Sequence, residues 1–216
     1  MRFSERVKLE MRSQKVTCMF VATSQLRLVT NAALLSNVTW ETLEKLDADL
    51  AGTGARLTYL DGCLEIMSPL SDEHEEPRNT LGQLLEIYMR MKNIRFYGRG
   101  STTIGKKELS ARKEPDESYC LSTRKSVPDL AIEVIVTSDG IEVLEIYRRV
   151  GVREVWFWQD AVISVYCLRE TGYELVSNSE VLPELDLRSL EFYSRMADQY
   201  DAVNAFMSFL TTDGHR

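Results

Sequence analysis

A glutamate in the middle of an apolar run constrains the fold of this chain more than any other feature. The run "VPDLAIEVIV" covers residues 127–136 and has the length and composition of a buried strand, with Glu133 between Ile132 and Val134. An isolated buried carboxylate costs several kcal/mol unless a neighbour compensates its charge. A metal ion, an arginine or a bound proton would each do so. The sequence therefore predicts a polar site inside the core.

Two further acids lie at the starts of predicted strands, Asp116 before "SYCLS" and Asp129 before "LAIEVIV". Asp129 and Glu133 share a face of one strand, but roughly 13 Å separates them, which is too far for both to bind one ion. If the two strands are neighbours, Asp116 lies about 5 Å from Glu133. That pair would suit a hard cation such as Mg²⁺. Pro-Asp at a strand start is also common turn chemistry.

The remaining pattern mixes strands and helices. Thr39 is a predicted N-cap for a helix over residues 40–50, and Asp61-Gly62 between two short runs predicts a two-residue β-hairpin. Pro77 is expected in the first turn of the next helix. Further strands are predicted at 94–98, 100–104, 118–122, 129–136, 154–160 and 163–170, with helices at 140–152 and beyond Pro183. This order predicts a single α/β domain over residues 26–210, an N-terminal extension over 1–25 and a tail over 211–216.

Composition narrows the class of protein. The chain has 216 residues, of which 44% are hydrophobic, yet no apolar run is long enough to span a membrane and no signal peptide begins the sequence. The four cysteines form no CxxC pair, which argues against a zinc site or a disulfide framework. We therefore expect a cytoplasmic protein with no membrane partner. The two histidines exclude chemistry that needs several imidazoles.

Charge is unevenly distributed along the chain. The net charge is -7, but between residues 90 and 113 basic residues are opposed by Glu108 alone. Such a segment is typical of a surface that receives a phosphate backbone, although a solvated surface has the same composition. We expect Arg99, Lys106 and Lys107 to contact nucleic acid.

The order of the motifs "YLDGCLEIMSP", "EPDESY", "VPDLAIEV" and "TSDGIEVLEIYRRVGVREVWFW" resembles the Uma-type putative restriction endonucleases, a bacterial branch of the PD-(D/E)XK nuclease superfamily. The resemblance covers most of the chain, from about residue 26 to about residue 208. It implies a restriction-endonuclease-like mixed β-sheet flanked by helices, with an N-terminal hairpin and C-terminal helices. It also implies that Asp116 and Glu133 bind Mg²⁺ or Mn²⁺ with the carbonyl of Val134, and that His74 or a glutamate beside it completes the catalytic site.

The sequence departs from the family at the catalytic lysine. The lysine of the D/E-x-K motif is replaced by Ile135, and the position in the following helix that carries a substitute lysine in this family holds Val143. Three interpretations remain open. A cation from elsewhere, such as Lys106, Lys107 or Arg148, enters the site; the metal acts alone and more slowly; or the chain binds without cutting.

The function that the resemblance implies is a magnesium-dependent endonuclease that hydrolyses phosphodiester bonds in DNA. The alternative is a catalytically degenerate nuclease-fold module that binds DNA or a protein partner without cleavage. A third interpretation is an interaction domain in which an arginine satisfies Glu133. Cutting both strands of a duplex needs two sites, so a homodimer is compatible with the leading function, although no residue pattern identifies a symmetric interface.

Overall fold

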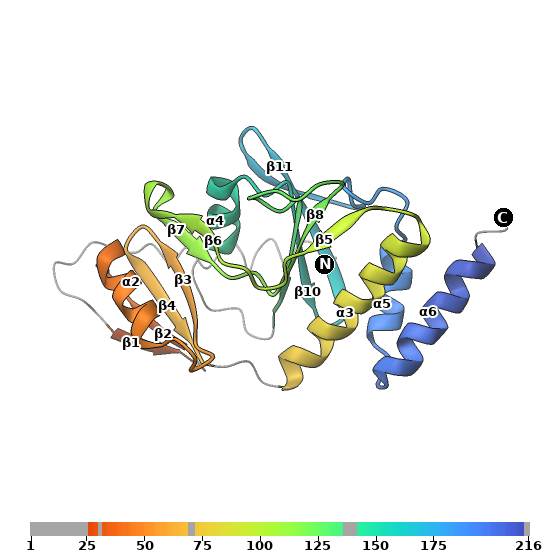
Figure 1. Cartoon of the computed structure of the whole chain (residues 1–216), viewed down its shortest axis with the longest axis horizontal. Coiled ribbons are helices and arrows are strands. Elements are labelled where there is room, and N and C mark those ends of the chain that lie inside the picture. Colours follow the sequence, from red (N-terminus) through yellow and green to blue (C-terminus); the bar gives the residue numbers. More distant parts are fainter. Residues whose placement is uncertain (1–25, 30–31, 69–71, 136–141, 214–216) are drawn as a thin grey trace, which may run out of the picture.

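Two β-sheets, joined and covered by helices, make up the part of the chain that is described (Figure 1). The computed structural model describes residues 26–29, 32–68, 72–135 and 142–213, without the side chains of residues 26–29, 72–75 and 213. The predicted extension over 1–25 therefore lies outside the described residues. One sheet lies at the left of Figure 1, and the other forms the centre of the molecule.

The first sheet is antiparallel throughout and is built around the predicted hairpin. Asp61 and Gly62 have positive φ angles of 47° and 85°, which is the backbone conformation that a two-residue hairpin turn requires. The order of the strands is β1 (Leu26–Val29), β2 (Ala32–Leu35), β4 (Cys63–Met67), β3 (Arg56–Leu60), β7 (Ala111–Lys113) and β6 (Ile104–Lys106).

Helix α2 (Trp40–Asp49) packs on this sheet and begins where the sequence predicts. The Thr39 hydroxyl accepts a hydrogen bond from the backbone N–H of Thr42 at 3.2 Å, which satisfies one of the free donors of the first turn. Leu43 of this helix and Leu57, Tyr59 and Leu64 of the hairpin form a small apolar cluster. The hairpin and the helix thus support each other.

The second sheet is mixed and carries Glu133 near its middle. Its order is β12 (Gly172–Val176), β11 (Val162–Arg169), β10 (Glu154–Gln159), β9 (Leu130–Val134), β8 (Glu117–Leu121) and β5 (Phe96–Gly98). Strands β9 and β10 are parallel, whereas the other neighbours are antiparallel. A mixed sheet flanked by helices is the restriction-endonuclease-like fold that was expected.

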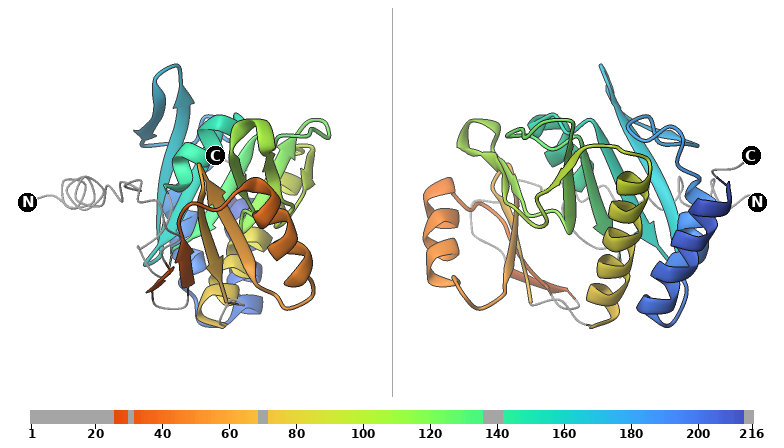
Figure 2. Two further views of the ribbon diagram at one scale, coloured as in Figure 1. Left: turned by 90° about the vertical axis from the view of Figure 1, so that its left-hand side faces the viewer. Right: turned by 45° about the vertical axis from the view of Figure 1, so that its right-hand side comes forward.

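Helices cover both faces of the second sheet. Helices α3 (Asp72–Met91), α5 (Leu187–Ser194) and α6 (Gln199–Asp213) lie together on one face, as the right-hand view of Figure 2 shows, and pack on Leu130, Ile132 and Trp156. Helix α4 (Val143–Val150) packs on the other face, which carries Ala131 and Val155. Because side chains alternate along a strand, Glu133 points with Ala131 toward α4 and the first sheet.

Several local predictions need correction. Pro77 lies inside α3 and not in its first turn, because the helix begins at Asp72; the acidic residues before Pro77 are favourable at a helix N-terminus. Residues 101–103 are not part of a strand, and β12 follows the expected final pair. The short strand β7 was not predicted at all, and it proves important for the site.

A buried tryptophan and three of the cysteines lie among the described residues. Trp156 is fully buried in the core, and Cys120 and Cys167 are buried free thiols on strands β8 and β11. Cys63 is disulfide-bonded, so the lack of a CxxC pair did not exclude a disulfide. None of the described helices is both long enough and apolar enough to cross a membrane.

Candidate active site

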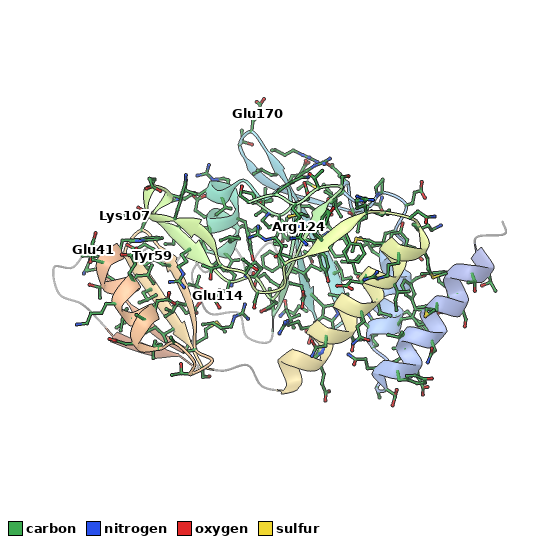
Figure 3. All side chains as sticks on the ribbon, in the orientation of Figure 1. Glu41, Tyr59, Lys107, Glu114, Arg124 and Glu170 are labelled. Carbon is green, nitrogen blue, oxygen red and sulfur yellow. The ribbon has the colours of Figure 1, made fainter. Side chains whose placement is uncertain are left out.

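The chain passes from one sheet to the other at the sequence "KEPD". Strand β7 of the first sheet ends at Lys113, and β8 of the second sheet begins at Glu117, so Glu114, Pro115 and Asp116 bridge the two sheets. Figure 3 shows Glu114 in the space between the sheets. Residues at the end of β7 and at the start of β8 therefore face the same interior region.

Asp116 lies beside Glu133, as expected if their strands were neighbours. Strands β8 and β9 are antiparallel with Glu117 opposite Ile132, which puts Asp116 one step further along, next to Glu133. Oδ2 of Asp116 accepts a hydrogen bond from the backbone N–H of Val134 at 2.7 Å. Both acids are buried, with 2% and 7% of their surface exposed. The geometry thus brings two carboxylates together inside the protein.

Lys113 supplies the cation next to Glu133. Its Nζ lies 3.2 Å from Oε2 of Glu133, and both side chains are less than a tenth exposed, at 8% and 9%. Strands β7 and β3 are antiparallel with Arg112 opposite Tyr59, so the next residue of β7, Lys113, comes next to Thr58. Thr58 in turn lies opposite Glu65 of β4. Lys113, Thr58 and Glu65 are all buried. The first sheet therefore presents a polar row to the second sheet at this point.

Two arginines surround Asp116. The Arg56 guanidinium donates to Oδ1 of Asp116 and to the backbone carbonyl of Glu114. Nε of Arg78, from α3, donates to the backbone carbonyl of Asp116 at 3.0 Å and to the carboxylate of Glu117 at 3.2 Å. The start of β8 is thus held from both sides.

Tyr147 of α4 completes the surroundings of Glu133 by donating its hydroxyl proton to Oε1. Burial raises the pKa of Glu133, and the attraction of Lys113 opposes this rise only in part. Burial, together with the charge of Glu133, raises the pKa of Tyr147 well above its usual value, so the hydroxyl remains a donor. Burial opposes the charge of Arg56, but the ion pair with Asp116, together with the charges of Glu133 and Glu114, outweighs it and raises the pKa of Arg56.

None of the three residues considered as replacements for the catalytic lysine, namely Lys106, Lys107 and Arg148, supplies the cation of this site. Lys107 pairs with Glu41 at the outer end of the first sheet, where both are labelled in Figure 3, and Arg148 pairs with Glu145. Lys106 is exposed on β6. Helix α4, whose Val143 replaces a lysine of the family, contributes Tyr147 instead. A search for D/E-x-K spacing cannot find Lys113, because it precedes both acids in the chain.

Carboxylate oxygens are the ligands that Mg²⁺ and Mn²⁺ prefer, so the donor chemistry of Asp116 and Glu133 fits such an ion. Each of their four oxygens already has at least one protein donor. A carboxylate oxygen has two lone pairs and can accept from a donor and bind a metal at the same time. Among the described residues, no group of three or more His, Cys, Asp or Glu side chains is arranged to hold a metal. The pair of acids would therefore need water or backbone ligands as well.

The other candidates from the sequence lie outside this cluster. His74 belongs to α3, but its side chain is outside the described part, so its role stays a prediction. Asp129 accepts hydrogen bonds from the backbone N–H of Leu121 at 2.7 Å and from Lys125, which is the turn chemistry considered for it. Arg99 lies at the far side of β8, where it donates to the backbone carbonyls of Lys125 and Ser126.

A cleft of about 550 Å³ adjoins the acidic pair. Arg56 and Glu114 line it from the side of the site, and Arg78 and Ser101 line it from α3 and the loop after β5. Arg56 touches Asp116 and also borders the cleft, so its guanidinium lies between the cleft and the buried carboxylates.

A mixed sheet with helices on both faces is the restriction-endonuclease-like architecture, and within it Asp116, Glu133 and Lys113 lie together. The chain also matches the model of the Uma2 family, described as putative restriction endonucleases, over residues 40–197. The chain therefore belongs to the Uma2 family of the PD-(D/E)XK superfamily. No curated protein matches the chain significantly.

Proposed function

We propose that the protein is a cytoplasmic, metal-dependent DNA endonuclease that hydrolyses phosphodiester bonds. One observation carries this proposal: Nζ of Lys113 lies 3.2 Å from Glu133, whose neighbour is Asp116. Lys113 at the end of β7, Asp116 directly before β8 and Glu133 on β9 therefore meet in one buried place. Membership in a family of restriction endonucleases supports the same reaction.

The cost of this arrangement favours a functional role over a structural one. A buried ion pair typically stabilises a fold no better than well-packed apolar residues of similar volume. Here Lys113, Glu133 and Asp116 are all buried, and Arg56 is mostly covered. Evolution toward stability alone would replace such a cluster with hydrophobic side chains. Perturbed groups next to a cleft are a common mark of an active site.

Asp116 and Glu133 would hold the divalent cation, Mg²⁺ or Mn²⁺, with the backbone carbonyl of Val134. When bound, such an ion polarises the scissile phosphate and lowers the pKa of a coordinated water. In the reaction, water oxygen bonds to phosphorus, the ester P–O bond breaks, and the leaving oxygen takes up a proton.

The residues of the chain have separate tasks in this reaction. The Lys113 ammonium places positive charge where negative charge develops on the phosphate oxygens. Tyr147 orients Glu133 through its hydrogen bond. Arg56 and Arg78 line the cleft, where guanidinium groups attract a phosphate. Burial of the site lowers the local dielectric constant and thereby strengthens each of these electrostatic interactions.

A plasmid-nicking assay with Mg²⁺ or Mn²⁺ tests the proposal. The wild type should nick supercoiled DNA, and Glu133→Gln and Lys113→Met should lower the rate by about 10²–10³-fold, as the loss of one electrostatic group at a transition state does. Lys45→Met removes an exposed lysine on α2 and is the control that should keep the wild-type rate. Circular dichroism must show that each variant is folded. Nicking by Glu133→Gln at the wild-type rate would refute the assignment.

The second candidate is a degenerate module that binds DNA or a protein partner without cleavage. The observation in its favour is that Arg56, Val134, Tyr147 and Lys113 already satisfy the two carboxylates without a metal. Wild-type protein that binds DNA but does not nick it with either metal would establish this candidate. Metal-dependent nicking that depends on Glu133 would eliminate it.

A further inference from the structure

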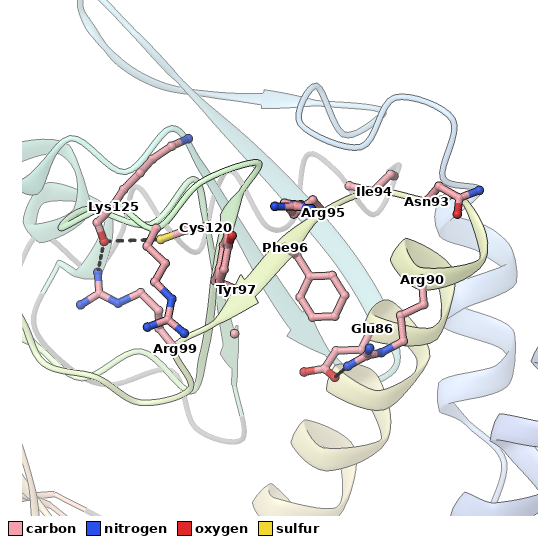
Figure 4. Close-up of a pocket in the computed structure, with 12 residues that line it drawn as sticks. Glu86, Arg90, Asn93, Ile94, Arg95, Phe96, Tyr97, Arg99, Cys120 and Lys125 are labelled. Carbon is pink, nitrogen blue, oxygen red and sulfur yellow. Dashed lines mark hydrogen bonds and ion pairs between the residues drawn. The ribbon is translucent and has the colours of Figure 1, made fainter.

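A basic groove lies along the outer edge of the second sheet, on the side of β8 away from β9. It has a volume of about 810 Å³ and follows β5, the edge strand (Figure 4). Glu86 is the acidic residue in its lining, against five basic residues: Arg90, Arg95, Arg99, Arg124 and Lys125. In a protein whose net charge is -7, this concentration of positive charge marks a surface for an anionic ligand.

Two distant segments of the chain build the basic groove. The first segment supplies Arg90 at the end of α3 and the two residues that flank β5, Arg95 and Arg99. The second segment is the loop after β8, which supplies Arg124 and Lys125. Arg99 holds that loop in place through the backbone carbonyls of Lys125 and Ser126, at 3.1 and 2.5 Å. The fold itself therefore brings the two basic segments together.

Several of these cations remain available to a ligand. Among the described residues, Arg95 and Arg124 have no carboxylate partner, and both are exposed. The Arg124 guanidinium lies 5.3 Å from the centre of the Tyr97 ring, a contact that positions it without neutralising it. Arg90 is 3.7 Å from Glu86 across an exposed pair, which is worth little in water.

The basic groove leads toward the candidate active site. Tyr97 and Gly98 of β5 lie opposite Cys120 and Tyr119 of β8. Asp116 precedes Tyr119 by three residues, whereas Arg95 lies beside Ser122, whose backbone N–H donates to the Arg95 carbonyl. Ser122 is six residues from Asp116, which corresponds to about 20 Å, or roughly six base pairs of duplex DNA. After β5, the chain runs from Arg99 to Ser101, which lines the cleft beside Asp116.

We propose that the basic groove binds the sugar–phosphate backbone of duplex DNA roughly six base pairs from the bond that is cut, with Arg95 and Arg124 as its principal phosphate contacts. This inference rests on the proposed nuclease function and assigns the flank of its substrate to a particular face. Guanidinium groups bind phosphate oxygens in a bidentate way, and phosphate contacts of this kind fix the register of a protein on DNA without reading its sequence. The groove is thus a positioning surface for the scissile bond.

Fluorescence anisotropy with a labelled duplex tests this inference in buffer with EDTA, so that cleavage plays no part. The double variant Arg95→Ala/Arg124→Ala should bind roughly tenfold or more weakly than the wild type at about 0.1 M salt, and the slope of log K against log salt should fall in magnitude by about 1.8. The control Lys45→Ala/Arg188→Ala also removes two exposed cations, from α2 and α5, and should match the wild type.

The outcomes separate this inference from the proposed function. If the double variant binds DNA with the affinity and salt slope of the wild type, or if both double variants weaken binding equally, the groove is not the contact surface even when the protein nicks plasmid. If the double variant loses affinity and slope as stated while the wild type fails to nick, the groove binds DNA although the nuclease proposal is wrong. Wild-type protein that does not bind the duplex overturns the inference.

Discussion

Removing Lys113 tests the buried ion pair at the centre of the site. In Lys113→Met, Glu133 keeps its burial but loses the cation 3.2 Å away. Truncating one partner of a buried pair typically costs about 3–5 kcal/mol, because the remaining charge is uncompensated. The side chains are 8% and 9% exposed, so solvent does little to reduce this cost. We expect a loss in the free energy of unfolding of this order at neutral pH, without metal.

The loss of unfolding free energy in Lys113→Met should increase as the pH rises. The pKa of Glu133 in the folded protein is raised above the ordinary value of 4.5, so the folded state holds a proton that the unfolded state releases. Stability therefore falls as pH rises from the unfolded pKa toward the folded pKa, by up to about 1.4 kcal/mol per pH unit. Lys113→Met raises the folded pKa further, so the fall should continue to higher pH in the variant than in the wild type.

Urea denaturation followed by circular dichroism, from about pH 5 to about pH 8 in EDTA, measures this difference. The double variant Lys113→Met/Glu133→Gln removes both charges and should recover much of the lost stability. If Lys113→Met is as stable as the wild type at every pH, or if its deficit is largest at low pH, the reasoning about the pair is wrong.

Three further substitutions have expected outcomes. Glu154→Leu should lower the free energy of unfolding by more than about 3 kcal/mol in urea denaturation, because it leaves buried donors without their acceptor, namely Trp156, Ser179 and the backbone N–H groups of residues 180 and 181. Gly105→Ala should be strongly destabilising and should slow nicking, because its Cβ would lie 2.1 Å from the Ala111 carbonyl oxygen and displace β7. Gly52→Ala is the control, because φ is also positive at Gly52 but the surrounding space is open. The same denaturation should show a loss of only about 1–2 kcal/mol for this control. Tyr147→Phe should cost about 1–3 kcal/mol and slow nicking in the plasmid assay, because Glu133 loses its neutral donor.

Much of the fold could be predicted from local sequence. The turn at Asp61-Gly62, the cap at Thr39 and the apolar spacing of α3 depend on near neighbours, and each appears where local chemistry predicts it. Strand β7 could not be recognised in this way. It has three residues and pairs with β3, more than 50 residues earlier in the chain, so its stability comes from long-range contacts.

The same distinction applies to the candidate site. Asp116 and Glu133 could be paired in advance, because they sit on consecutive strands that form a hairpin-like neighbour pair. Arg56 comes from 60 residues before Asp116, and Lys113 approaches Glu133 from the other sheet. No periodicity in the sequence encodes either contact. Only part of the basic groove could be predicted from the sequence. The basic residues between 90 and 99 lie close together in the chain, whereas Arg124 and Lys125 are brought next to them only by the fold.

The most direct measurement of the central claim is calorimetric titration of Mn²⁺ into the wild type, Glu133→Gln and Lys113→Met, each shown to be folded. We predict that the wild type binds the ion, that Glu133→Gln does not, and that Lys113→Met still binds it although nicking is lost. Absence of binding to the wild type, or equal binding by Glu133→Gln, would contradict a metal centre at Asp116 and Glu133.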